Sequence, residues 1–204
     1  MSRSTEARRP APPSLHDASA SVASDGATAR SRARRTAAPS LRDKLRRAAW
    51  TLVQGTAYRY SPAPLHAWRR ALLRAFGAKV GPGAAPYPSA TVWAPWNLEM
   101  QAGSCLGPRS VCYCVDRVVL EARSVVSQGV HLCGGTHDHR AADFALLAGP
   151  IRVGAGAWVA ADAFVGPGVS IGDRAVVGAR SVVVKDVPAD MVVVGNPARS
   201  IARR

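Results

Sequence analysis

Three histidines and a cysteine fall within nine residues near the middle of this chain, where such side chains could bind a metal or move a proton. The cluster is His131, Cys133, His137 and His139, with Thr136 and Asp138 between them. All four are ligand types for zinc, but their spacing matches neither CxxC nor HExxH, so we expect no metal. One imidazole can instead take a proton from an alcohol near neutral pH, which acyl transfer to a hydroxyl requires.

A repeat with a period of six must position this cluster. Six hydrophobic residues fall at an unbroken interval of six, and they are Val153, Val159, Val165, Ile171, Val177 and Val183. The residue directly after each of them is Gly or Ala in five of the six cases. Helices repeat near 3.6 residues and strands at 2, whereas hexapeptide arrays form parallel β-helices. Three short strands would make one coil of eighteen residues, which predicts that Val153 stacks on Ile171 and Val159 on Val177, about 4.8 Å apart.

The repeat is interrupted beside the histidines. It begins near Val80, is irregular through Val92, and resumes at Met100. It breaks again after His137, and residues 138–150 do not fit the period. Because the coils are scaffold, we expect an extruded loop over 138–150 to carry function.

The first forty residues differ in composition from the rest. They are rich in Ala, Ser, Arg and Pro and have no aromatic residue, so we expect residues 1–40 to be a disordered tail. An Arg- and Ser-rich leader also resembles an organelle transit peptide, although it lacks the apolar segment of a secretory signal.

Residues 41–79 are predicted to form a helical cap on the open end of the solenoid. Ser40 can cap a helix with Leu41, Leu45, Ala49 and Leu52 on one face, and a second helix has Leu65, Trp68, Leu72 and Phe76 at helical spacing, closed by Gly77. Arg69, Arg70 and Arg74 line the other side of the second helix. Basic amphipathic helices of this kind can also lie on a membrane surface.

Charge and cysteine usage narrow the function classes. The net charge is +14, of which +4 lies in residues 1–40 and +10 in residues 41–204, and the repeat has no stripe of alternating basic and aromatic residues. We therefore expect no nucleic-acid partner, although an anionic cofactor would benefit from the field. We expect the four cysteines, Cys105, Cys112, Cys114 and Cys133, to be reduced and buried, which favours a cytoplasmic protein, and we expect no membrane span.

Several segments of residues 80–202 resemble the hexapeptide-repeat acyltransferases, and among them the sugar O-acetyltransferases of the colanic-acid, galactoside and maltose type. The matching segments are 135–138 (GTHD), 151–154 (IRVG), 157–159 (AWV), 165–169 (VGPGV), 177–188 (VGARSVVVKDVP) and 195–199 (GNPAR). The resemblance implies an all-β, left-handed parallel β-helix over residues 80–204. It also implies a homotrimer that binds acetyl-CoA in clefts between subunits.

The resemblance also implies roles for individual residues. His137 occupies the position of the family's catalytic histidine, and Ala161, Ala179, Val184, Lys185 and Arg199 sit where the family contacts CoA. Asp116 lies one position away from the place where the family has a carboxylate that binds the acceptor. Some relatives carry a further basic residue where this chain has Ala202, which leaves the role of neighbouring Arg203 open.

The expected reaction is direct acetyl transfer to a sugar or polysaccharide precursor, with His137 as general base and no acyl-enzyme. Two alternatives remain open from the sequence. One is N-acetylation of an amino-sugar or amino-acid acceptor, and the other is a β-helix that binds without catalysis. The acceptor could be a sugar, a sugar nucleotide or a lipid-linked saccharide. The last would suit peripheral contact of residues 41–77 with the inner face of the membrane.

Overall fold

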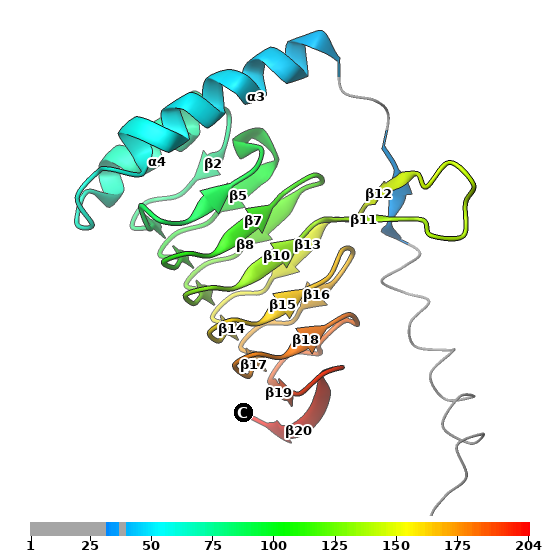
Figure 1. Cartoon of the computed structure of the whole chain (residues 1–204). Helices are drawn as coiled ribbons and strands as arrows, with labels where there is room; N and C mark the ends of the chain where they lie inside the picture. The colour runs from blue at the N-terminus through cyan, green and yellow to red at the C-terminus, as the bar shows by residue number, and fades with distance from the viewer. Residues whose placement is uncertain (1–31, 37–39) are drawn as a thin grey trace, which may run out of the picture.

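The structure is a computed structural model that describes residues 32–36 and 40–204. Its main body is a stack of coils in which the chain visits three parallel sheets in turn (Figure 1). Face 1 holds β2 (Lys79–Val80), β5 (Leu98–Met100), β8 (Val118–Leu120), β13 (Ile151–Val153) and β16 (Ser170–Ile171). Face 2 holds β3 (Ala85–Pro86), β6 (Cys105–Leu106), β9 (Val125–Val126), β14 (Trp158–Val159), β17 (Val176–Val177), β19 (Met191–Val194) and the antiparallel β20 (Arg199–Arg203). Face 3 holds β4 (Thr91–Val92), β7 (Val111–Tyr113), β10 (His131–Cys133), β15 (Phe164–Val165) and β18 (Val182–Val183).

The register between coils confirms the stacking predicted from the repeat. Val153 pairs with Ile171, and Val159 pairs with Val177. These aliphatic side chains point inward and are buried. The glycine that follows Val153 is required by close packing, because a Cβ on Gly154 would lie 2.7 Å from the backbone nitrogen of Asp173.

Residues 80–92, which we expected to be irregular, form a complete coil through β2, β3 and β4. The six-residue period was concealed because the inward position between Val80 and Val92 is filled by Pro86. Proline is tolerated there because β3 is the terminal strand of face 2.

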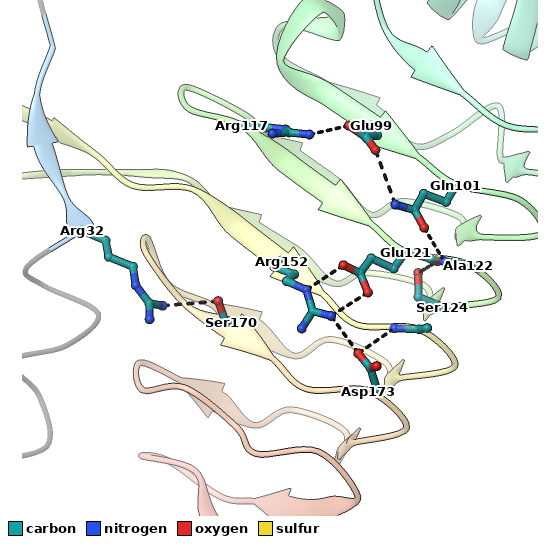
Figure 2. Close-up of polar contacts among 11 residues, drawn as sticks. Arg32, Glu99, Gln101, Arg117, Glu121, Ala122, Ser124, Arg152, Ser170 and Asp173 are labelled. Atoms are coloured by element: carbon teal, nitrogen blue, oxygen red, sulfur yellow. Dashed lines mark hydrogen bonds and ion pairs between the residues drawn. The ribbon is translucent and has the colours of Figure 1, made fainter.

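The outer sides of the three faces differ in polarity. On face 1, the Arg152 guanidinium donates to Glu121 at 2.7 Å and to Asp173 at 2.8 Å (Figure 2). On face 2, Val125 and Trp158 are exposed large hydrophobic side chains. Face 1 is therefore suited to contact water, whereas face 2 presents apolar side chains outward.

The predicted helices are confirmed, but α3 packs with the opposite side. Helix α3 (Leu41–Val53) begins with a capping box between Ser40 and Asp43 and continues into a π-helical turn (Gln54–Tyr58), and α4 (His66–Ala75) follows. The buried residue of α3 is Trp50, whose indole donates to the Val92 carbonyl at 2.7 Å. The predicted apolar face, with Leu41, Leu45 and Leu52, is exposed. Aromatic bulk and a hydrogen bond to the solenoid edge, rather than the leucine spacing, decide which side of α3 faces inward.

Helix α4 also differs from the prediction, because its arginines, predicted on the side opposite the apolar face, face the solenoid and satisfy its open edge, while Leu65 and Trp68 are exposed. Arg69 is fully buried and donates from Nε to the Pro86 carbonyl at 2.7 Å. Arg70 donates to Ala84 O and Arg74 to Val80 O, each at 2.9 Å. These carbonyls lie in the first coil, and within residues 32–36 and 40–204 no further strand pairs with β2 or β3 on that side. The guanidinium groups therefore supply the donors that another strand would have provided. The cap therefore closes the sheet edge by hydrogen bonding as well as by apolar contact.

A β-hairpin interrupts the solenoid where the chain passes from face 3 to face 1. Strands β11 (Gly135–His137) and β12 (Leu146–Ala148) pair antiparallel and project from the coils (Figure 1). The extruded segment therefore begins at Gly135, before the predicted 138–150. Strand β1 (Arg34–Arg35) adds to β12 as a third strand. Residues 32–36 of the expected tail are thus ordered against the hairpin, and the rest of that prediction lies outside the described residues.

Candidate active site

His137 ends strand β11 and is exposed on the projecting hairpin. Its position follows from Leu132, which is buried in the core of β10, and from Gly134 and Gly135, which let the chain leave the coil. A Cβ on Gly134 would lie 2.7 Å from the Tyr113 carbonyl oxygen, so the exit needs glycine. The hairpin then holds His137 in register with Leu146 on β12.

A backbone carbonyl fixes the tautomer of His137. Its Nδ1 lies 2.8 Å from the Phe144 carbonyl oxygen, which can only accept a hydrogen bond. The neutral imidazole therefore carries its proton on Nδ1 and presents Nε2 as an acceptor. A histidine in this state can take a proton from a substrate at Nε2.

The side chain of Phe144 also contacts the His137 imidazole. Its ring stacks on the His137 ring, with centroids 4.6 Å apart and an interplanar angle of 8°. Phe144 has a φ of 45°, a left-handed backbone conformation that is costly for a bulky residue. One strained residue at the hairpin tip thus provides both the carbonyl and the ring that orient His137. The sequence offered a weak signal for it, since Phe144 is the only aromatic residue in 138–150.

The predicted acceptor residue Asp116 lies on the same corner as His137. This corner joins face 3 to face 1, and Asp116 falls between β7 and β8, one coil nearer the helices than the hairpin. Asp116 is half-buried and accepts from the Arg117 backbone nitrogen at 2.6 Å.

The residues predicted to contact CoA lie on two different corners of the solenoid. Val184 and Lys185 follow β18 on the His137 corner, on the coils away from the helices. Ala161 and Ala179 instead lie between face 2 and face 3, stacked so that Arg180 N donates to the Ala161 carbonyl at 2.9 Å. Arg199 begins β20 and pairs with Val194, near this second corner.

The remaining members of the histidine cluster are separated from His137. His131 projects from face 3 and packs edge-on against Phe164, with ring centroids 5.6 Å apart. Cys133 ends β10 at the hairpin base, and its thiol donates to the Gly135 carbonyl at 3.2 Å. Within residues 32–36 and 40–204, no group of three or more His, Cys, Asp or Glu side chains is arranged to hold a metal ion.

The cysteines are free thiols, as predicted, but only Cys112 and Cys114 are fully buried. Cys105 and Cys133 are half-buried, because each lies on an outward-facing strand position. Burial raises the pKa of the Cys133 thiol, which disfavours the thiolate that a nucleophile would need.

Sequence reasoning missed the N-terminal contacts beside this corner. Arg32 donates to the Gly168 carbonyl at 3.1 Å and to Ser170 Oγ at 3.3 Å, and it forms an ion pair of 3.0 Å with Asp186 (Figure 2 shows the contact with Ser170). Arg35 pairs with Asp143 of the hairpin at 3.3 Å. No periodicity marks these arginines in the sequence, because they join a strand that exists only once the hairpin has formed.

Comparison with known proteins identifies the family. The profile described as "Bacterial transferase hexapeptide (six repeats)" matches residues 150–185. A protein of Escherichia coli (strain K12), provisionally named colanic acid biosynthesis acetyltransferase WcaF, is 44% identical over 155 residues, which are 76% of this chain and 85% of the relative. The chain belongs to the hexapeptide-repeat acetyltransferases. The resemblance stated from the segments between residues 135 and 199 is thereby confirmed.

Solved structures agree with the hexapeptide-repeat fold. A maltose O-acetyltransferase from Clostridium difficile 630 superposes with a TM-score of 0.75 at 20% identity, covering 88% of this chain and 96% of the other. The acetyltransferase VCA0836 from Vibrio cholerae, solved with acetyl-coenzyme A, superposes with a TM-score of 0.73 at 22% identity, covering 80% and 90%. At these identities the likeness shows the fold, and it confirms the left-handed parallel β-helix.

Proposed function

We propose that this hexapeptide-repeat acetyltransferase transfers the acetyl group of acetyl-CoA to a hydroxyl of a saccharide, with His137 as the general base. The observation that carries the proposal is the 2.8 Å contact between His137 Nδ1 and the Phe144 carbonyl. It leaves Nε2 to accept the proton of an alcohol. The saccharide acceptor is supported by the relative named for colanic acid biosynthesis.

In the proposed reaction the acceptor oxygen attacks the thioester carbon while its proton passes to Nε2 of His137. A backbone N–H stabilises the oxyanion, the C–S bond breaks as the C–O ester bond is retained, and the imidazolium returns its proton to the leaving thiolate. Direct transfer of this kind uses no protein thiol. The raised pKa of Cys133, the cysteine at the hairpin base, fits that expectation.

The two-corner arrangement supports a site shared between subunits of a homotrimer. Lys185 lies on the His137 corner, whereas Ala161 and Ala179 lie across face 3 on another. One cofactor that touched both sets would need a groove where the His137 corner of one chain meets the other corner of its neighbour. Small side chains at Ala161 and Ala179 would let a pantetheine arm approach the backbone, and the cations of Lys185 and Arg199 would suit phosphates. The exposed apolar side chains of face 2 also favour association.

The test is an acetyl-transfer assay with acetyl-CoA and matched acceptor panels, one of saccharides with free hydroxyls and one of amino sugars and amino acids. We expect thiol release with the hydroxyl panel and a mass increase of one acetyl group on the product. Transfer only to amines would replace this proposal with N-acetylation. If acetyl-CoA neither supports transfer nor raises the melting temperature, a binding protein without catalysis becomes the better explanation.

A further inference from the structure

Positive charge is concentrated on the helical cap, residues 41–79. This segment has nine Lys and Arg against one Asp, a net charge of +8. Residues 80–204 have eleven Lys and Arg against nine Asp and Glu, a net charge of only +2. The single acidic residue of the cap, Asp43, is engaged with Ser40 in the capping box. One end of the molecule therefore has a strong positive field.

The outer side of α3 combines this charge with an exposed apolar stripe. Leu41, Leu45 and Leu52 are 73%, 64% and 69% exposed. At about 100° per residue they fall within a narrow sector of the helix, opposite the buried Trp50. Arg42 and Lys44 are exposed on the two flanks of that stripe. We call these five residues, the three leucines with Arg42 and Lys44, the outer surface of α3.

This stripe plays no part in closing the solenoid. The closing contacts come from the opposite side of α3, where Trp50 donates to Val92 O and Gln54 accepts from Val92 N at 2.7 Å. Arg46 and Arg47 are also turned inward, where they lie over the rings of Trp96 and Trp93.

We propose that the outer surface of α3 binds an anionic membrane, with its leucines at the boundary between headgroups and acyl chains. A leucine stripe flanked by cations is the pattern of helices that lie in a bilayer interface. The flanking Arg42 and Lys44 complement lipid phosphates. A second copy of the chain is a poorer occupant, because the same positive end would face itself. A nucleic acid would use the cations and leave the leucines in water.

This binding mode sets the height of His137 above the membrane. In Figure 1, α3 crosses the end of the coil stack, and the hairpin projects sideways farther down. Three inter-strand steps separate β2 from β13 on face 1, which is roughly 14 Å, and the helical layer adds about 10 Å. If the proposed function holds, the acceptor would be a lipid-linked saccharide that extends about 25 Å from the bilayer, whereas membrane binding itself does not depend on that function.

Vesicle co-sedimentation of the full chain tests the proposal without any activity measurement. Vesicles containing phosphatidylglycerol should bind the protein, those of phosphatidylcholine alone should bind it weakly, and added salt should weaken binding. The triple variant Leu41→Ser, Leu45→Ser, Leu52→Ser should lower the partition coefficient by about 100-fold or more, because the apolar anchor is lost. The double variant Arg42→Glu, Lys44→Glu should lower it by about tenfold or more.

Matched controls carry the same chemical changes on the solenoid. The control for the leucine variant is Val194→Ser with Ile201→Ser, which removes exposed apolar side chains at the opposite end of the solenoid. The control for the charge variant is Arg109→Glu with Arg123→Glu, which reverses exposed charges on the coils. Neither control should change vesicle binding. The proposal fails if wild-type protein ignores anionic vesicles. It fails equally if the leucine variant binds anionic vesicles as well as wild type does, because binding would then come from a basic surface that attracts any polyanion. If wild type does not bind vesicles and the leucine variant forms a smaller oligomer than wild type, a second copy of the chain covers the stripe instead.

Discussion

Replacing His137 by alanine separates catalysis from folding in this protein. The side chain is exposed, and among the residues that the structure describes it hydrogen-bonds to the Phe144 carbonyl and stacks on the Phe144 ring. A neutral hydrogen bond contributes about 1 kcal/mol and an aromatic stack about 0.5–1.5 kcal/mol. The unfolding free energy should therefore fall by no more than about 2.5 kcal/mol. Loss of a general base should lower kcat by about 10²–10⁴, which corresponds to roughly 2.7–5.4 kcal/mol of activation free energy.

The assay is thiol release from acetyl-CoA with a saturating saccharide acceptor, measured beside thermal unfolding with and without acetyl-CoA. His137→Ala should remain folded and should still be protected by acetyl-CoA, because the residues predicted to contact CoA are untouched. His139→Ala provides the matched control, since that imidazole is exposed two residues away and should leave kcat unchanged. A His137→Ala protein that turns over within about tenfold of wild type would refute the general-base role.

Three further changes test the scaffold and its surroundings. Leu132 is buried in the coil at the base of the hairpin, so Leu132→Ala should lower the unfolding free energy by about 2–5 kcal/mol in denaturant titrations. Val125 points outward, so Val125→Ala should lower it by about 1 kcal/mol or less. Equal losses for the two variants would contradict the inward and outward assignment of these side chains. Burial lowers the pKa of His131, so the unfolded chain binds its proton more readily and stability should fall as pH is lowered through the ordinary histidine range near 6.5. His131→Gln should flatten the pH dependence of the melting temperature between about pH 7 and 5, and an unchanged slope would assign it to other groups. Cys133→Ser should keep kcat within about twofold, because direct transfer needs no thiol, and a hundredfold loss would instead support an acyl-enzyme.

The sequence was sufficient for most of the scaffold. A period of six places one aliphatic residue in the interior of each strand, and that constraint is local, so the pairing of Val153 with Ile171 followed from spacing alone. The first coil was harder to recognise, since Pro86 fills an inward position that the pattern reserves for aliphatic residues. His137 could be nominated as the base from the break in the repeat and the resemblance to the family. The tautomer of its imidazole could not be predicted from the sequence, because the Phe144 carbonyl that fixes this tautomer is brought to His137 only by the hairpin.

Contacts between distant segments were decided by the tertiary structure. Leucine spacing placed Leu41, Leu45 and Leu52 on the apolar face of a helix predicted to cap the solenoid. The residue that faces the solenoid is Trp50 instead, because one indole can fill the end of the stack and also donate to Val92. Periodicity reports which residues share a side of a helix, but the choice between two sides depends on the surface that the helix meets. The strand formed by Arg34 and Arg35 illustrates the same limit, because its partner β12 lies more than one hundred residues away in sequence. Local repetition therefore determined the coils, and long-range hydrogen bonding determined how the cap, the hairpin and the candidate base are set upon them.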